Sequence, residues 1–340
     1  MDNWNENIVP PQEDAELKSI RKSLRKQNLK NVLTSLILAA ALLLVSVYGI
    51  IPAVEKLYWG PYDSDYDAGS DLHLVLKANT ELFHPGYKVQ MLAGKSGFAS
   101  YDLHITRTDD ATGQKEYLNG TLSRGDLSLD YAYYDRGMEE LYFHADYVQD
   151  LGNGEIYDIR DMWTEDAVEL ISQLPNYIQL KAIAFFPEDL NMEQFLQLLL
   201  KYNYDGRDGV SVIWTAVRVE SNHGIPLSPI GFSVNSYNGY ELNETYPEFF
   251  IRNFEEDGSH LAQHFKSLLQ FSTDQVEKGK GISLRNIHGE YTQYVLEYVE
   301  EHGVNTYACL VSATPQGLQS MLDDGTASHL ALLDSWIDVG

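Results

Sequence analysis

Residues 32–54 read VLTSLILAAALLLVSVYGIIPAV, and no charged side chain occurs between Asn31 and Val54. An α-helix rises about 1.5 Å per residue, so about 20 residues cross a hydrocarbon core of about 30 Å. A helix buried in the core of a soluble protein rarely stays apolar on every face over so many turns. We therefore predict a transmembrane helix over residues 31–54.

The charges that flank this stretch are asymmetric. Only Lys56 follows it closely, whereas six basic residues precede it: Lys18, Arg21, Lys22, Arg25, Lys26 and Lys30. Cytoplasmic flanks of membrane helices carry an excess of Lys and Arg. We therefore expect a single-pass protein of the cell membrane, with residues 1–30 in the cytoplasm and the rest of the chain extracytoplasmic.

A cleaved signal peptide is the alternative interpretation of this stretch. The stretch exceeds the usual apolar region of about 7–15 residues in such peptides. The segment near its end, Gly49-Ile50-Ile51-Pro52, is a poor cleavage site, and no cysteine follows that would be lipidated. The sequence therefore indicates an anchor that stays in the mature protein.

The net charge and the cysteine content exclude several classes of function. The 340 residues include 24 Lys and Arg against 50 Asp and Glu, a formal net charge of −26. An acidic surface repels phosphate backbones, so we expect no direct nucleic-acid binding. The single cysteine, Cys309, excludes an intramolecular disulfide and a cysteine-based zinc cluster.

No motif for catalysis or cofactor binding stands out. The chain lacks a nucleophile elbow, a phosphate-binding loop and a GxGxxG sequence. His260 and His264 have the i, i+4 spacing of metal ligands but no HExxH order. We interpret both as packing or solvated histidines and predict no enzyme activity, no catalytic residue, no cofactor and no metal site.

Residues 55–165 are expected to form a β-rich domain. In DLHLVLKANTELF (71–83), Leu72, Leu74 and Leu76 alternate with polar or smaller neighbours, which predicts a strand. The segments on either side of DDATG (109–113) alternate in the same way and predict a hairpin. Segments around residues 127–148 continue this pattern.

Residues 166–340 are expected to form an α/β sandwich. Two units share the order strand, proline, helix, strand and tryptophan, and their tryptophans are Trp214 and Trp336. Two β-α-β units predict a mixed sheet with helices on one face and both tryptophans buried. Thr164 is expected to cap a helix that Pro175 ends, and residues 221–258 are expected to be irregular. A helix over 259–271 presents one apolar face: Leu261, Phe265, Leu268 and Leu269.

The cytoplasmic segment carries a narrow apolar stripe formed by Leu17, Ile20 and Leu24. One interpretation is a juxtamembrane helix whose bases contact anionic membrane lipid. The other is a short docking helix for a cytoplasmic partner. Thirty residues are too few for a catalytic domain.

The order of a basic tail, one span, a β-rich part and an α/β end resembles an anti-sigma factor family of Gram-positive bacteria. Its members carry sigma-factor-regulator N-terminal and C-terminal domains. The similarity is strongest in the C-terminal half, where it begins at Leu174-Pro175. It continues through Pro229-Ile230-Gly231-Phe232, HFKSLLQF (264–271) and YVEEHGVNTYACLVSATPQGLQSML (298–322).

This resemblance implies a transcription regulator that holds an extracytoplasmic-function sigma factor and senses the state of the envelope. On that basis residues 55–165 and 166–340 correspond to the N-terminal and C-terminal sigma-factor-regulator domains. Leu17, Ile20 and Leu24 are the candidate partner-binding residues, and the short segment leaves room for a partner subunit in the membrane. The alternatives are an extracytoplasmic envelope-binding accessory protein with no sigma partner and an anchored hydrolase, for which no motif is present.

Overall fold

The computed structural model divides the chain into two compact units, Met1–Leu57 and Tyr58–Gly340. We call the second the outer unit. The structure describes residues 13–51, 53, 71–124, 126–130, 143, 159–204, 209–220, 229–234, 245–251, 257–277 and 289–337. Much of the predicted strand region around 127–148 lies outside these residues, as does the segment that joins the two units.

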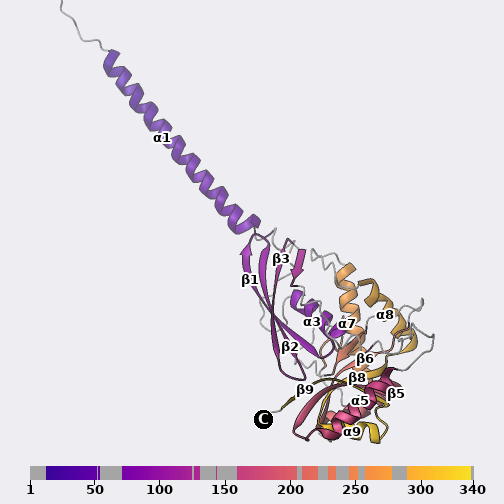
Figure 1. Cartoon of the computed structure of the whole chain (residues 1–340). Helices are drawn as coiled ribbons and strands as arrows, with labels where there is room; N and C mark the ends of the chain where they lie inside the picture. Colours follow the sequence, from indigo (N-terminus) through magenta and orange to yellow (C-terminus); the bar gives the residue numbers. More distant parts are fainter. Residues whose placement is uncertain are drawn as a thin grey trace, which may run out of the picture. The chain divides into compact units, whose positions relative to one another are not determined.

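The described part of the first unit is one long helix. Helix α1 spans Glu13–Val45 and continues into the π-helical turn η1, Ser46–Ile50 (Figure 1). Within it, Leu17–Ile50 is long and apolar enough to cross a membrane, with a mean hydropathy of 2.3 and no buried side chain. The predicted span therefore lies in a helix, and that helix begins well before the apolar stretch.

A four-stranded antiparallel sheet forms the first part of the outer unit. Its strands lie in chain order: β1 (Tyr87–Gly97), β2 (Ser100–Asp109), β3 (Lys115–Ser123) and β4 (Asp126–Leu129). The predicted hairpin is confirmed, because β2 pairs with β3. Gly113 lies in its turn with φ +70°, a conformation that favours glycine.

The predicted strand over 71–83 is wrong, because these residues form helix α3, Asp71–Phe83. One face of α3, with Leu72 and Leu76, packs on the four-stranded sheet. Another face, with Leu74, Ala78 and Leu82, belongs to the core of the rest of the outer unit. Because α3 is buried on two sides, Leu72 and Leu76 lie on one face and Leu74 lies on the other. In the sequence these leucines occur at every second position, as they would in a strand.

A second sheet has the strand order β7-β6-β8-β5-β9. Its five strands are β5 (Ile178–Asn191), β6 (Val210–Val217), β7 (Gly231–Ser233), β8 (Asn305–Ala313) and β9 (His329–Ile337). Helix α6 (Met192–Leu199) and turn η4 (Leu200–Tyr204) connect β5 to β6, and helix α9 (Pro315–Asp323) connects β8 to β9. Both predicted β-α-β units are therefore present.

The prediction of a mixed sheet is wrong, since every described strand pair is antiparallel. Strand β8 lies between β5 and β6, and β5 lies between β8 and β9. Each β-α-β unit thus accepts a strand of the other unit between its own two strands, as in ferredoxin-like split β-α-β topologies. Strands that are parallel within a unit never become neighbours.

The helices of this part belong mainly to one core cluster. Residues of α6, α9, α7 (Ser259–Glu277) and α8 (Gly289–His302) share it with one face of the sheet. The predicted apolar face of α7 is fully buried in this cluster. Gly303 ends α8 with φ +79°, and the Thr314 hydroxyl accepts the Gly317 N–H to cap α9.

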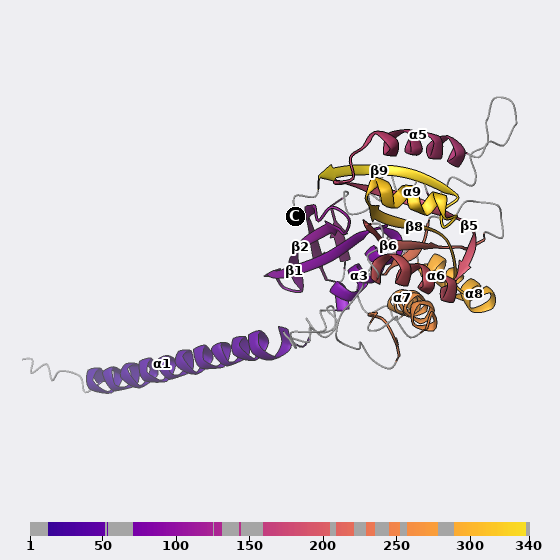
Figure 2. The ribbon, with the colours of Figure 1, turned by 90° about the horizontal axis from the view of Figure 1, so that it is seen from below.

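Helix α5 spans Ile159–Gln173 and lies alongside β9 (Figure 2). Thr164 is therefore inside this helix, and its predicted role as the N-cap is wrong. Its hydroxyl donates to the Arg160 carbonyl and accepts the N–H of Leu330, the second residue of β9. The polar residue that suggested a cap instead joins the helix to the sheet.

The two tryptophans differ, although the sequence predicted both to be buried. Trp214 is fully buried in β6, whereas Trp336 is partly exposed on the edge strand β9. The region expected to be irregular contains the short strand β7, which pairs with β6. A Cβ atom at Gly231 would lie 1.9 Å from the Thr215 carbonyl oxygen and 2.4 Å from a Trp214 ring carbon. Only glycine therefore fits at this position of β7, where the backbone lies against the Trp214 ring.

Candidate functional site

The predicted partner-binding residues lie on the first four turns of α1. Leu17, Ile20 and Leu24 are 49%, 52% and 50% exposed, so no described part of this chain covers them. At about 100° per residue, the three side chains fall within an arc of about 60°. The stripe is therefore a continuous apolar surface.

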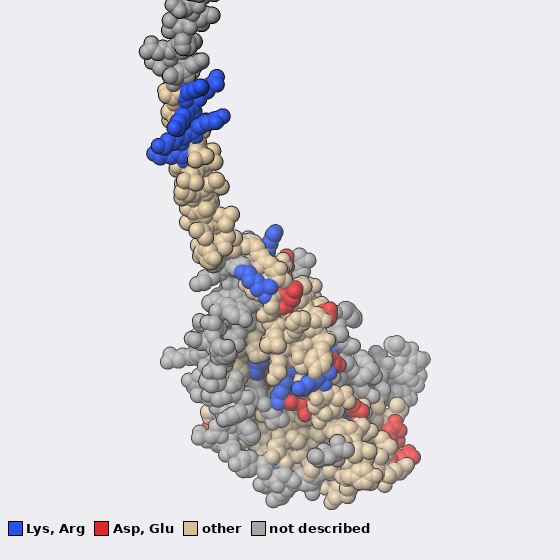
Figure 3. Space-filling model, turned by 90° about the vertical axis from the view of Figure 1, so that its left-hand side faces the viewer, with Lys and Arg blue, Asp and Glu red and all other residues tan. Residues whose placement is uncertain are grey.

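The six basic residues occupy the other side of the same helix. On the same helical wheel they span an arc of about 180°, whose centre lies roughly opposite the stripe. Figure 3 shows these basic side chains gathered over several turns of α1. The segment is thus a two-faced helix, and the bases lie opposite the stripe rather than around it.

The predicted pair of histidines on α7 has two different environments. His260 is partly exposed and lies 3.4 Å from a carboxylate oxygen of Glu248, whereas His264 is fully buried. Among the described residues, no group of three or more His, Cys, Asp or Glu could hold a metal ion. The spacing in the sequence did not distinguish the two histidines, so the role of His264 was not predicted.

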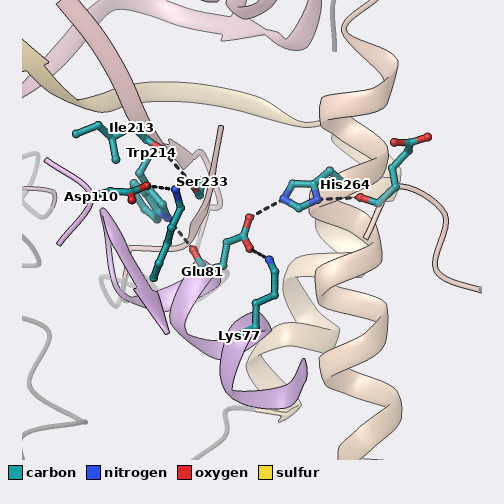
Figure 4. Close-up of polar contacts among 9 residues, drawn as sticks. Lys77, Glu81, Asp110, Ile213, Trp214, Ser233 and His264 are labelled. Atoms are coloured by element: carbon teal, nitrogen blue, oxygen red, sulfur yellow. Dashed lines mark hydrogen bonds and ion pairs between the residues drawn. The ribbon is translucent and has the colours of Figure 1, made fainter. Parts of the chain in front are cut away.

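His264 belongs to a buried network of charged groups, which we call the α3–α7 triad: Lys77, Glu81 and His264 (Figure 4). Its Nε2 atom lies 2.7 Å from Oε1 of Glu81, and the Lys77 ammonium pairs with Oε2 of the same carboxylate. Lys77 and Glu81 are one turn apart on α3. A single carboxylate therefore joins α3, the first described helix of the outer unit, to α7.

The position of one proton in the triad follows from its acceptors. Nδ1 of His264 lies 2.8 Å from the Glu248 carbonyl oxygen, which can only accept, so Nδ1 carries a proton. One further proton lies between His264 Nε2 and the Glu81 carboxylate. The Glu248 carbonyl oxygen and the Glu81 carboxylate are thus the hydrogen-bond partners of the two ring nitrogens.

Neighbouring groups fix the triad in place. The Trp214 indole N–H donates to the Glu81 carbonyl oxygen at 2.7 Å, and the Phe232 and His264 rings pack edge to face with their centroids 5.7 Å apart. The Lys77 ammonium lies 5.1 Å from the centroid of the Phe250 ring. The backbone and the side chain of Glu81 are thus held by different parts of the second sheet and its helices.

The electrostatics of Glu81 favour its ionised form. Burial raises its pKa, but Lys77 and His264 outweigh burial and hold the pKa at about 2, against an ordinary value of 4.5. Asp110 behaves differently, because burial raises its pKa in spite of its ion pair with Lys88. Figure 4 shows Asp110 together with the Lys77–Glu81 pair.

We expect Glu81→Gln to lower the stability of the protein at neutral pH and to reduce its dependence on acid. The folded-state pKa lies below the unfolded value, so the carboxylate stabilises the fold above about pH 4.5, by roughly 3 kcal/mol, and this is lost as the pH falls toward 2. Urea unfolding of the detergent-solubilised chain, followed by tryptophan fluorescence, measures this. The difference between wild type and variant should shrink below about pH 4.5. A difference that stays constant down to pH 3 would contradict the assignment.

A second buried ion pair joins the four-stranded sheet to the second sheet. The Lys181 ammonium of β5 lies 2.7 Å from a carboxylate oxygen of Asp109, the last residue of β2. Both Lys181 and Arg107 contact the face of the Tyr87 ring, at 5.1 and 4.8 Å from its centroid. The junction between the two sheets therefore contains several charged groups out of contact with water.

The remaining candidate for chemistry, Cys309, is buried in β8. Burial raises the pKa of its thiol, so it stays protonated and unreactive. The described residues thus show a polar junction that can hold and position helices, with no nucleophile set beside a base.

The sequence did contain a signal for this junction. His264 lies on the same face of its helix as Leu261, Phe265 and Leu268, and a histidine in an apolar face is buried with it. A buried histidine requires acceptors, which points to an acid elsewhere in the chain. Its identity as Glu81 depends on a tertiary contact that no spacing shows.

Comparisons with protein-family models, with curated proteins and with solved structures return no match to this chain. The resemblance to anti-sigma factors therefore rests on the sequence motifs quoted above.

Proposed function

We propose that this chain is a membrane-anchored regulator of the anti-sigma type. In this proposal residues 1–30 hold an extracytoplasmic-function sigma factor, and the outer unit senses the state of the envelope. The observation that supports it best is the continuity of α1 from Glu13 to Val45. The apolar stripe and the predicted span belong to one helix.

This continuity bears on the two interpretations of the cytoplasmic segment. A helix of 34 residues, Leu17–Ile50, is about 51 Å long, whereas the hydrocarbon core is about 30 Å thick. A segment lying flat on the lipid would need a break between Leu24 and Asn31, and α1 has none there. The helix therefore favours a stripe that projects from the membrane surface and is available to a protein.

The two faces of this segment suit two partners. Lys26 and Lys30 are closest to the predicted span and can contact anionic headgroups. The stripe on the opposite face can pack on a groove of the sigma factor. Burying three aliphatic side chains contributes a few kcal/mol, and confinement to the membrane raises the effective concentration. A partner subunit in the membrane would add contact area.

A second candidate is an envelope-binding accessory protein with no sigma partner. The size of the outer unit favours it, since that unit covers Tyr58–Gly340 and contains both sheets. A sigma-factor reading frame next to this one would favour the regulator. A neighbouring transporter or wall enzyme would favour the accessory protein.

Both candidates require the N-terminus inside and the C-terminus outside. We expect a reporter that is active only outside the cytoplasm to be active when fused to Gly340, and a reporter active only inside to be silent there. Changing Arg21, Lys22, Arg25 and Lys26 to Glu should give poor insertion or mixed orientation, because it removes the positive-inside bias. Activity of the inside reporter alone at Gly340 would reverse the orientation and end both proposals.

A further inference from the structure

The position of α3 in the outer unit is unusual for a single helix. It belongs to two separate apolar clusters, one with the four-stranded sheet through Leu72 and Leu76, and one with the second sheet and its helices through Leu74, Ala78 and Leu82. It is also the first described element after residues 54–70, which join it to the span. Displacement of α3 would therefore alter both sheets at once.

Polar contacts fix α3 on the side of the second sheet. The Glu81 carboxylate bonds His264 of α7, and the Glu81 carbonyl accepts the Trp214 N–H of β6. A buried ionic group is seldom the most stable way to fill such a space, because an apolar side chain needs no desolvation of charge. Such groups instead define one arrangement of the packed elements, because a shift leaves charges buried without partners.

We propose that α3 is a releasable helix of the outer unit, held in its docked position by the α3–α7 triad, and that its release is the conformational change by which the outer unit switches state. The docked state is the one in the structure. In the released state the apolar faces of α3 and of both sheets separate. The inference concerns the outer unit alone and requires no sigma factor.

Several titratable groups lie near the triad, and their protonation affects its stability at low pH. Besides the triad itself, α3 contributes His73, the residue directly after α3 is His84, α7 contributes His260, and the segment before α7 contributes Glu248. The turn after β2 contributes Asp110, which is paired with Lys88 of β1 and is close enough to Glu81 to feel its charge. Of these groups, Glu81 is the one whose neutralisation removes the ionic link from α3 to α7.

Hydrogen exchange of the full chain in lipid nanodiscs tests this proposal. We expect Glu81→Gln to raise exchange of the α3 amides (71–83) about tenfold, whereas the amides of β8 and α9 change by less than about twofold. The matched control is Asp324→Asn, which makes the same carboxylate-to-amide change in the Lys201–Asp324 pair. That control should leave α3 exchange unchanged.

A second arm uses the wild-type chain alone and does not depend on the folding of any variant. Lowering the pH from about 7 to about 3.5 should raise α3 exchange, corrected for the intrinsic rate, ahead of exchange in β8 and α9. Selective opening of α3 in either arm supports the proposal. Equal acceleration over the whole outer unit, or no acceleration of α3, would overturn it.

Discussion

Replacing Trp214 by alanine is expected to lower the free energy of unfolding of the outer unit by about 3–5 kcal/mol. The side chain is fully buried, its ring lies 5.3 Å from that of Phe143, and its N–H donates to the Glu81 carbonyl. Truncation therefore removes a large packed surface and leaves a buried carbonyl without its donor. Chemical unfolding of the solubilised chain measures the loss.

The other tryptophan provides the matched control for this prediction. Trp336 is partly exposed on the edge strand β9, so Trp336→Ala should lower the stability by less than about 1.5 kcal/mol. Trp214→Phe keeps most of the packing and removes the donor, so it should fall between the two at about 1–3 kcal/mol. Equal losses from Trp214→Ala and Trp336→Ala would contradict the described cores.

Changing Leu17, Ile20 and Leu24 to Ser is expected to raise transcription from the promoter of the partner sigma factor several-fold. The stripe is an exposed apolar surface on the described part of the cytoplasmic segment, and serine at all three positions removes the burial that would hold the sigma factor. Deletion of residues 1–30 should have an effect at least as large. A reporter gene behind that promoter measures both.

Leu29 offers a control on the same helix. It is exposed, and on the helical wheel it lies among the bases, roughly opposite the stripe. Leu29→Ser should leave transcription at the wild-type level, whereas Leu24→Ser alone should raise it. Membrane fractionation must show equal amounts of each variant in the membrane. Equal effects of the two leucine changes would mean that helix stability, and not the stripe, governs the response.

Elements with local signals were predictable from the sequence. The long apolar helix, the hairpin around Gly113 and helices α7 and α9 each show their sequence pattern within a short stretch of the chain. Thr314 and Pro315 mark the start of α9, and Gly303 marks the end of α8. In these elements local propensity and tertiary packing agree.

The errors came from tertiary packing. Helix α3 is buried on two sides, so its leucines lose the single apolar stripe that identifies a surface helix. The interleaving of β5 and β8 depends on pairing between strands more than 100 residues apart, and no local pattern encodes it. The Glu81–His264 contact joins residues 183 positions apart, so the sequence showed a histidine in an apolar face but not its partner.

Capture of the chain from crosslinked membranes tests the proposed function most directly. Cells expressing the tagged full chain, or the triple serine variant of Leu17, Ile20 and Leu24, are crosslinked, and the recovered proteins are identified by mass spectrometry. We expect a sigma factor to be recovered with the wild type and to be strongly depleted with the variant. Recovery of no sigma factor with either chain, or of the same amount with both, would contradict it.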